Sequence, residues 1–168
     1  GKGVECYFHE IPEHVEKFDM LILSPGVNPE LDFIQEAKAG GAEIIGELEI
    51  AYRIARGTFI AITGTNGKTT TTALTGAIMK TYFDEVFVVG NIGIPYTETA
   101  LETTEKSVTV AEVSRFQLET IMDFHPNVSA ILNITPDHLN RHGTMENYIA
   151  VKERITENQT EKDCVVLN

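Results

Sequence analysis

The stretch Gly64-Thr65-Asn66-Gly67-Lys68-Thr69-Thr70 constrains the fold of this chain more than any other. It follows an apolar run at residues 58–63, typical of a buried strand, and it opens a helical pattern near Lys68. Glycines let backbone N–H groups turn inward without a Cβ clash, and a helix N-terminus adds the positive end of its dipole. The stretch therefore predicts a phosphate-binding loop, with the Lys68 amine on the terminal phosphates and the Thr69 hydroxyl on Mg²⁺.

This loop is shorter than the full phosphate-binding pattern, G-x-x-x-x-G-K-[ST]. Position 62 is isoleucine where that pattern has its first glycine, so G-x-x-G-K-T remains. The alternative is an ordinary strand-to-helix turn with a solvated lysine. The strand pattern before the loop and the helical pattern after it favour phosphate binding.

The composition is that of an ordinary globular protein. Of the 168 residues, 42% are hydrophobic and 23% are charged, which suits one domain or somewhat more. The net charge of −12 disfavours nucleic acid as a partner, so an anionic ligand needs a local site. No apolar run reaches the about 18 to 20 residues of a membrane span, and no signal-peptide pattern is present. We therefore expect a cytoplasmic protein that does not bind membranes.

Strand-like and helix-like patterns alternate along the chain. The expected strands are residues 4–8, 20–23, 43–45, 58–63, 86–89, 108–111, 128–134 and 164–167. The expected helices are residues 12–18, 47–56, 115–122 and 144–158, one from Asn28-Pro29 to Gly40, and one from Lys68 with Ala73, Leu74, Ala77, Ile78 and Tyr82 on one face. Apolar strands separated by helices predict an α/β fold, with a parallel sheet, flanking helices and ligands at the carboxyl ends of the strands.

The pattern becomes more regular after Gly57, which suggests a boundary between two units. The chain also starts within a strand-and-helix pattern and stops on an apolar run at residues 165–167. We therefore expect it to be a piece of a longer protein.

Charged side chains follow two of the expected strands at their carboxyl ends. Glu112 closes the run 108–111, where phosphate-binding-loop enzymes carry an acidic Mg²⁺ ligand, and a cap of the next helix is the alternative. After the run 128–134, one stretch crowds together Asp137, His138, Arg141 and His142. A functional site and a solvated or structural role for His138 both remain open.

Lys152 lies within an apolar helical stripe. The stripe consists of Met145, Tyr148, Ile149 and Ile155. A lysine at such a position commonly packs its stem and keeps its amine in water. The alternative is a desolvated lysine whose amine is neutral and reactive.

Several ordered motifs resemble the Mur ligases of peptidoglycan synthesis. They are the residues 24–27, 64–70, 90–93, 112–119 and 132–155. The resemblance covers nearly the whole chain, and the run Ser-x-Phe-Gln-Leu-Glu at 114–119 is similar to the members that add D-glutamate. Arg115 replaces the commoner second serine, and Asn140 replaces an aspartate. Arg115 would either alter substrate contact or point outward, and Asn140 would remove one charge near the metal.

The resemblance implies two incomplete domains. Residues 57–168 would be a P-loop-type ATPase half-domain, preceded at residues 1–56 by the end of a Rossmann-like UDP-binding domain, and the C-terminal amino-acid-binding domain would be absent. The implied enzyme is an ATP-dependent carboxylate–amine ligase that joins D-glutamate to UDP-N-acetylmuramoyl-L-alanine through an acyl phosphate. Its partners would be small molecules only, and the full-length enzyme would be a monomer. The fragment by itself would be inactive.

The resemblance also implies roles for individual residues. The ATP-binding residues would be Gly64, Thr65, Asn66, Gly67, Lys68, Thr69 and Thr70. The metal ligands would be Thr69 and Glu112 for one Mg²⁺, and His138 and Lys152, which is carbamylated in this family, for a second metal. The catalytic residues would be Lys68, Glu112, His138 and Lys152. The substrate-binding residues on the UDP-sugar side would be Gly26, Asn91, Ser114 and Gln117.

Three alternatives remain: a Mur ligase that adds another amino acid, a folylpolyglutamate-type ligase, and a nucleotide-binding module without catalysis. The element Phe116-Gln117-Leu118 argues against the first two. The joint presence of Glu112, His138 and Lys152 disfavours the third, because a mere binder needs no second metal site. A signalling GTPase is disfavoured because the chain has no Asn-Lys-x-Asp motif.

Overall fold

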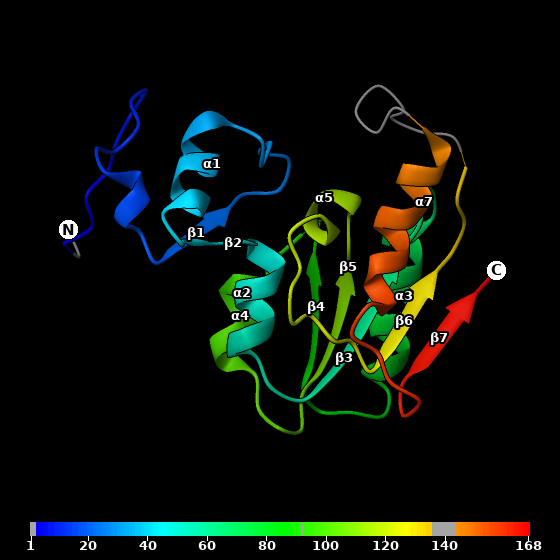
Figure 1. The fold of residues 1–168 in the computed structure, drawn as a ribbon. Coiled ribbons are helices and arrows are strands. Elements are labelled where there is room, and N and C mark those ends of the chain that lie inside the picture. Colours follow the sequence, from blue (N-terminus) through cyan, green and yellow to red (C-terminus); the bar gives the residue numbers. More distant parts are fainter. Residues whose placement is uncertain (1–2, 92, 136–143) are drawn as a thin grey trace.

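The chain forms two parallel sheets (Figure 1). The structure is a computed structural model, and it describes residues 3–91, 93–135 and 144–168. The smaller sheet pairs β1 (Met20–Leu23) with β2 (Glu43–Gly46). The larger sheet has the order β4-β5-β3-β6-β7, and its strands are β3 (Thr58–Thr63), β4 (Val86–Gly90), β5 (Val108–Glu112), β6 (Val128–Ile131) and β7 (Cys164–Leu167). These strands all pair in parallel, which confirms the predicted fold class.

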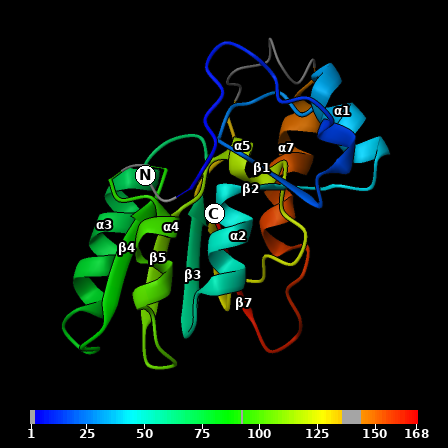
Figure 2. The same ribbon diagram turned by 90° about the vertical axis from the view of Figure 1, so that its left-hand side faces the viewer.

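Helices connect the strands and cover both faces of the larger sheet. They are η1 (Val15–Lys17), α1 (Asp32–Ala39), α2 (Glu47–Ile54), α3 (Lys68–Met79), α4 (Tyr96–Thr99), η2 (Ala100–Glu102), α5 (Arg115–Leu118), α7 (Met145–Glu153) and η3 (Arg154–Thr156). Figure 2 shows α3 on one side of the strands and α2 on the other. In the described part of the chain, no helix is long and apolar enough to cross a bilayer.

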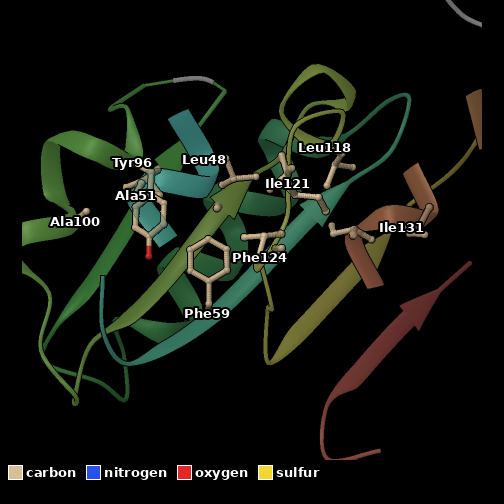
Figure 3. Close-up of a cluster of buried hydrophobic side chains, with 14 residues drawn as sticks. Leu48, Ala51, Phe59, Tyr96, Ala100, Leu118, Ile121, Phe124 and Ile131 are labelled. Atoms are coloured by element: carbon tan, nitrogen blue, oxygen red, sulfur yellow. The ribbon is translucent and has the colours of Figure 1, made fainter. Parts of the chain in front are cut away.

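The main core lies on the face of the sheet opposite α3. Alternate residues of β3 point to opposite faces, so Phe59 and Ala61 join this core while Ile60 and Ile62 face α3. Figure 3 shows Phe59 beside Phe124, and their rings meet edge to face with centroids 5.3 Å apart. Leu48 and Ala51 of α2 are fully buried in the same cluster. Helix α2 therefore packs on the larger sheet, although it follows the smaller sheet directly in sequence.

A buried carboxylate fixes α2 in this position. The Glu49 side chain is fully buried and accepts hydrogen bonds from the backbone N–H groups of residues 122–124 at 2.9 to 3.1 Å. It also accepts one from Arg53 Nε at 2.9 Å, and Arg53 in turn donates two to Glu43 of β2 at 2.7 and 2.8 Å. Charged groups that are hydrogen-bonded on all sides are strongly held. The network thus joins the smaller sheet to the loop that precedes β6.

Two expectations for the N-terminal part are wrong. Residues 4–8 form no strand in the structure, and Val4 and Phe8 are 77% and 78% exposed, so no burial favours the extended form. Helix α1 begins at Asp32 instead of Pro29. The reason is local: the Asn28 side-chain oxygen accepts a hydrogen bond from the Glu30 N–H at 3.1 Å, which holds a turn in place of the first helical residues.

Several other elements are shorter than expected. The helix expected at 12–18 is the single turn η1, and the helix expected at 115–122 is the short α5. The strand expected at 128–134 ends at Ile131, because the next residues turn toward the loop after β3. The helix expected at 144–158 divides into α7 and the turn η3.

Helix α3 contacts the sheet through Thr72, Gly76 and Met79, and not through the predicted apolar face. Thr72 and Gly76 are buried, whereas Leu74, Ile78 and Tyr82 are 59%, 53% and 85% exposed. A Cβ atom at position 76 would clash with a methyl group of Val88 on β4. Glycine therefore lets α3 approach the sheet closely, and Leu74 and Ile78 are left outside while Met79 packs against the core.

Candidate active site

The carboxyl ends of β3, β4 and β5 meet at one hollow of about 170 Å³. We call it the active-site cavity, and it is lined by Gly64, Thr65, Lys68, Asn91, Ser114, Arg115, Phe116, Tyr148 and Lys152. Parallel strands end at the same edge of a sheet, which brings residues far apart in sequence together. The phosphate loop and the strand-end residues Asn91 and Ser114 thus lie together at this edge.

The phosphate loop joins β3 to α3 through two glycines in the left-handed region. Gly64 has φ 153° and Gly67, the N-cap of α3, has φ 80°. A Cβ atom on Gly64 would lie 3.1 Å from Leu132 Cβ, so the neighbouring strand leaves little room for a larger residue. Thr69 and Thr70 are exposed, and their hydroxyls are therefore accessible to a ligand.

Asn133 holds this loop from the end of the β6 segment. Its side-chain oxygen accepts hydrogen bonds from the N–H groups of Thr65 and Asn66 at 3.1 and 2.8 Å. Its side-chain nitrogen donates to the carbonyl oxygen of Asn66 at 3.0 Å. We missed this role in the sequence, where the one signal was a polar residue within an otherwise apolar run.

The amines of Lys68 and Lys152 lie at the floor of the cavity. Lys68 Nζ donates to the carbonyl oxygens of Gly64 and Thr65 at 3.0 and 2.9 Å, and Lys152 Nζ donates to that of Gly64 at 2.9 Å. Lys152 is 2% exposed, so the interpretation of an amine that reaches water is wrong. The inward position of Lys152 on its helical stripe is confirmed.

Tyr148 is a second residue that we did not predict for the site. It is 2% exposed, and its hydroxyl lies 3.1 Å from the hydroxyl of Thr65 in the phosphate loop. Lys152 Nζ lies 5.0 Å from the centre of its ring. Positions 148 and 152 are one helical turn apart on α7, so their side chains meet on the same face.

Glu112 ends β5 as predicted and is 2% exposed. The Asn91 side-chain nitrogen donates to its Oε1 at 3.4 Å. The helix that follows is capped by Ser114, whose hydroxyl accepts from the Gln117 N–H at 3.3 Å. The alternative of a helix cap at Glu112 is therefore wrong, and its role as a metal ligand stays a prediction.

A magnesium site at the described residues would need further oxygen donors. Among the residues that the structure describes, no group of three His, Cys, Asp or Glu side chains is placed to hold a metal. Mg²⁺ commonly takes one or two protein oxygens and fills the rest of its shell with phosphate oxygens and water. The carboxylate of Glu112 and the hydroxyl of Thr69 fit that chemistry.

Two of the four predicted substrate-binding residues lie outside the cavity. Asn91 and Ser114 line it, whereas Gly26 and Gln117 line a small neighbouring hollow between the loop after β1 and helix α5. Phe116 borders both. The Gln117 side-chain oxygen accepts hydrogen bonds from the N–H and the hydroxyl of Ser114, both at 2.9 Å, so part of its role is to shape the start of α5.

Arg115 does not point outward. It is 6% exposed and lines the cavity, and its guanidinium carbon lies 4.2 Å from the centre of the Phe116 ring. The interpretation of a solvent-facing arginine is therefore wrong. His138, together with Asp137, Asn140, Arg141 and His142, lies outside the described residues, and its predicted role remains a prediction.

Residues 62–168, well over half of the chain, match the family model of the Mur ligase middle domain. The chain belongs to the Mur ligase family. This match confirms the resemblance that the motifs indicated.

Curated Mur ligase relatives are similar to this chain over a limited part of their length. The UDP-N-acetylmuramoylalanine–D-glutamate ligase of Lachnoclostridium phytofermentans is 60% identical over 152 residues, which are 90% of this chain and 34% of that protein. Ligases of the same name from Alkaliphilus metalliredigens and Clostridioides difficile are 58% and 54% identical, over 90% and 94% of this chain and 33% and 35% of theirs. The chain spans about a third of the length of these relatives.

Solved Mur ligase structures share the fold. MurF ligase from Thermotoga maritima in complex with ADP has a TM-score of 0.55 at 20% identity, over 93% of this chain and 47% of that one. MurF from Acinetobacter baumannii has a TM-score of 0.54 at 16% identity, over 87% of this chain and 40% of that one. At these identities the likeness concerns the fold alone, and it agrees with the parallel sheet and flanking helices described above.

Proposed function

We propose that this chain is the ATP-binding part of a ligase that joins D-glutamate to UDP-N-acetylmuramoyl-L-alanine in peptidoglycan precursor synthesis. The observation that carries the proposal is the meeting of Lys68, Lys152 and Asn91 at one cavity beside Glu112. The 60% identity to a ligase of that name supports the choice of reaction.

The proposed reaction has two steps. The carboxylate of the L-alanine group attacks the γ-phosphorus of ATP, which forms an acyl phosphate and releases ADP. The amine of D-glutamate then attacks the acyl carbon, the C–O bond to phosphate breaks, and an amide, inorganic phosphate and a proton are the products. An anionic carboxylate must approach an anionic nucleotide in the first step, so positive charge at the cavity lowers the barrier. The position of Lys68 at the start of α3, on the lining of the cavity, supports it as the source of this charge.

Thr69 and Glu112 would hold the Mg²⁺ that accompanies ATP, and this ion when bound neutralises phosphate charge. We further propose that His138 and a carbamylated Lys152 serve a second metal. In carbamylation the neutral lysine amine attacks CO₂, a N–C bond forms, and one N–H proton leaves to solvent. The burial of Lys152 next to Lys68 supports this, because the modification replaces a second positive charge with a negative one.

The proposed domain division is residues 1–56 for the end of a UDP-binding domain and residues 57–168 for the first half of the ATP-binding domain. Gly26 and Gln117 line one small hollow of about 10 Å³, and their nearness supports contacts of both residues with the UDP-sugar substrate at this junction. The part that receives D-glutamate would lie outside these 168 residues. We propose a monomeric, cytoplasmic enzyme, since the reaction consumes ATP.

The test is ADP release by the full-length protein that contains this chain. We expect release to require UDP-N-acetylmuramoyl-L-alanine and D-glutamate together, and the 168-residue chain alone to form no amide. L-lysine and diaminopimelate in place of D-glutamate test the other amino-acid ligases, and a folate substrate tests the folylpolyglutamate type. Turnover with any of these but not with D-glutamate would refute the proposed substrate.

A further inference from the structure

Arg115 adds a third cationic side chain to the lining of the active-site cavity. Lys68 and Lys152 reach the cavity from the side of the phosphate loop, through hydrogen bonds to Gly64. Arg115 reaches it from the other side, directly after Ser114 at the end of the β5 segment. The three cations therefore line the same space from two different walls.

The guanidinium of Arg115 has a defined position. Its carbon atom lies 4.2 Å from the centre of the Phe116 ring, at the distance of a cation–π contact. The backbone around it is fixed by the reciprocal hydrogen bonds between Ser114 and Gln117. With 6% of its surface exposed, Arg115 is not a surface arginine with many rotamers. The side chain is thus preorganised at the wall of the cavity.

The charge on the lining of the cavity favours an anion, although Glu112 lies beside it, in contact with Asn91. Among the described residues that line it, Lys68, Lys152 and Arg115 are basic and none is acidic, although the whole chain has a net charge of −12. A concave site with charge of one sign raises the local concentration of ligands of the opposite sign. If Lys152 is carbamylated, Lys68 and Arg115 still keep their charges.

The position of Arg115 favours the carboxylate of the acid substrate over the nucleotide phosphates as its ligand. Lys68 lies on the phosphate loop, next to the nucleotide phosphates of the proposed function. Arg115 lies with Asn91 and Ser114 on the wall expected to face the UDP-sugar substrate. Its planar fork of N–H donors matches a carboxylate in a two-point contact, and its five donors allow other contacts at the same time.

We propose that Arg115 binds the carboxylate of the acid substrate and holds it for attack on the nucleotide. This inference rests on the proposed function, and it names the group that the arginine recognises. The contact between Arg115 and the carboxylate forms when the substrate binds, before any reaction. Its loss therefore weakens the binding of the acid as well as turnover.

The experiment compares two uridine ligands by titration calorimetry in the absence of ATP, with the full-length protein. The first ligand is UDP-N-acetylmuramoyl-L-alanine, and the second carries L-alaninamide, which has no carboxylate. We expect the wild type to prefer the acid by about 10- to 100-fold, as is usual for a hydrogen bond to a charged group. Arg115→Gln should remove this preference and leave the affinity for the amide unchanged. Arg115→Lys should retain part of it.

Three other results would contradict the proposed role of Arg115. A preference for the acid that persists in Arg115→Gln, or an equal loss of affinity for both ligands, would show that the arginine has no carboxylate contact. A weaker affinity for a non-hydrolysable ATP analogue alone would place Arg115 on the phosphates. Lys80→Gln, at an exposed position at the end of α3, is the matched control for general loss of charge. If the wild type binds neither uridine ligand, the proposed function fails first, and the ADP-release assay identifies that case.

Discussion

Lys68 and Lys152 donate hydrogen bonds to the same backbone oxygen, the carbonyl of Gly64, at 3.0 and 2.9 Å. One amine comes from the start of α3 and the other from the last turn of α7. Two ammonium groups this close repel each other, so a bound phosphate or the loss of one charge stabilises the arrangement. The two lysines therefore need different tests.

Replacing Lys68 should affect the chemical step. In the full-length enzyme, Lys68→Ala should lower kcat by a factor of about 10² or more, because it removes charge that acts on the transferring phosphoryl group. Steady-state ADP release measures the effect. Lys80→Ala, an exposed lysine of the same helix segment, should leave kcat unchanged. Near-normal turnover of Lys68→Ala would contradict the phosphate-loop assignment.

Replacing Lys152 should distinguish a carbamate from an ammonium. Lys152→Ala should abolish activity that added acetate partly restores, because a free carboxylate can occupy the place of the carbamate oxygens. Lys152→Arg should stay inactive, since arginine cannot form the carbamate. Activity of both variants is measured with and without acetate. An active arginine variant, or an alanine variant that does not respond to acetate, argues for a plain ammonium.

Replacing Asn133 should weaken nucleotide binding through the shape of the loop. Asn133→Ala removes the acceptor for the N–H groups of Thr65 and Asn66, and a lost bond of this kind costs about 1 to 3 kcal/mol. We expect a loss of ATP affinity of about 10-fold by calorimetry. Asn127→Ala is the matched control, since its side-chain oxygen accepts from the Phe59 N–H at 2.8 Å at the other end of β3. An equal loss in both variants would mean a general effect on the sheet.

Asp163 should make stability depend on acid pH. Its hydrogen bond with His125 at 2.6 Å, and the N–H of Thr160, lower the pKa of the carboxyl from 3.8 to about 2. A lowered pKa means that the carboxylate form stabilises the folded chain above about pH 4, and that this contribution is lost as the pH falls to about 2. Urea unfolding across that range should show a smaller pH dependence in Asp163→Asn. The same slope in the variant and the wild type would refute the link, and Asp84→Asn, at an exposed position, is the control.

Local sequence patterns were sufficient to predict the structure at the centre of the fold. The apolar run 58–63 and the glycine loop after it form β3 and the start of α3 as predicted, because strand, turn and helix signals agree there. Lys152 could also be placed, since a helical stripe fixes which way its side chain points.

The remaining features depend on side-chain contacts that no sequence pattern specifies, most of them between residues far apart in the chain. Asn133 contacts loop residues 65 and 66, which lie 68 and 67 positions earlier in the chain, so a polar residue in an apolar run did not reveal its partners. The orientation of α3 depends on how closely Gly76 approaches Val88, which hydrophobic periodicity does not reveal. Arg115 is buried against its own neighbour Phe116, and a sequence alone does not tell such a stacked arginine from a solvated one.

The outer face of α3 also affects how the chain can be handled in the laboratory. Leu74 and Ile78 are more than half exposed, and helices with such apolar faces promote self-association at the concentrations used for crystallisation. The sheet contact runs through Thr72, Gly76 and Met79 instead. Leu74→Lys and Ile78→Glu would therefore raise the solubility of the chain, and they would leave the contact between helix and sheet intact.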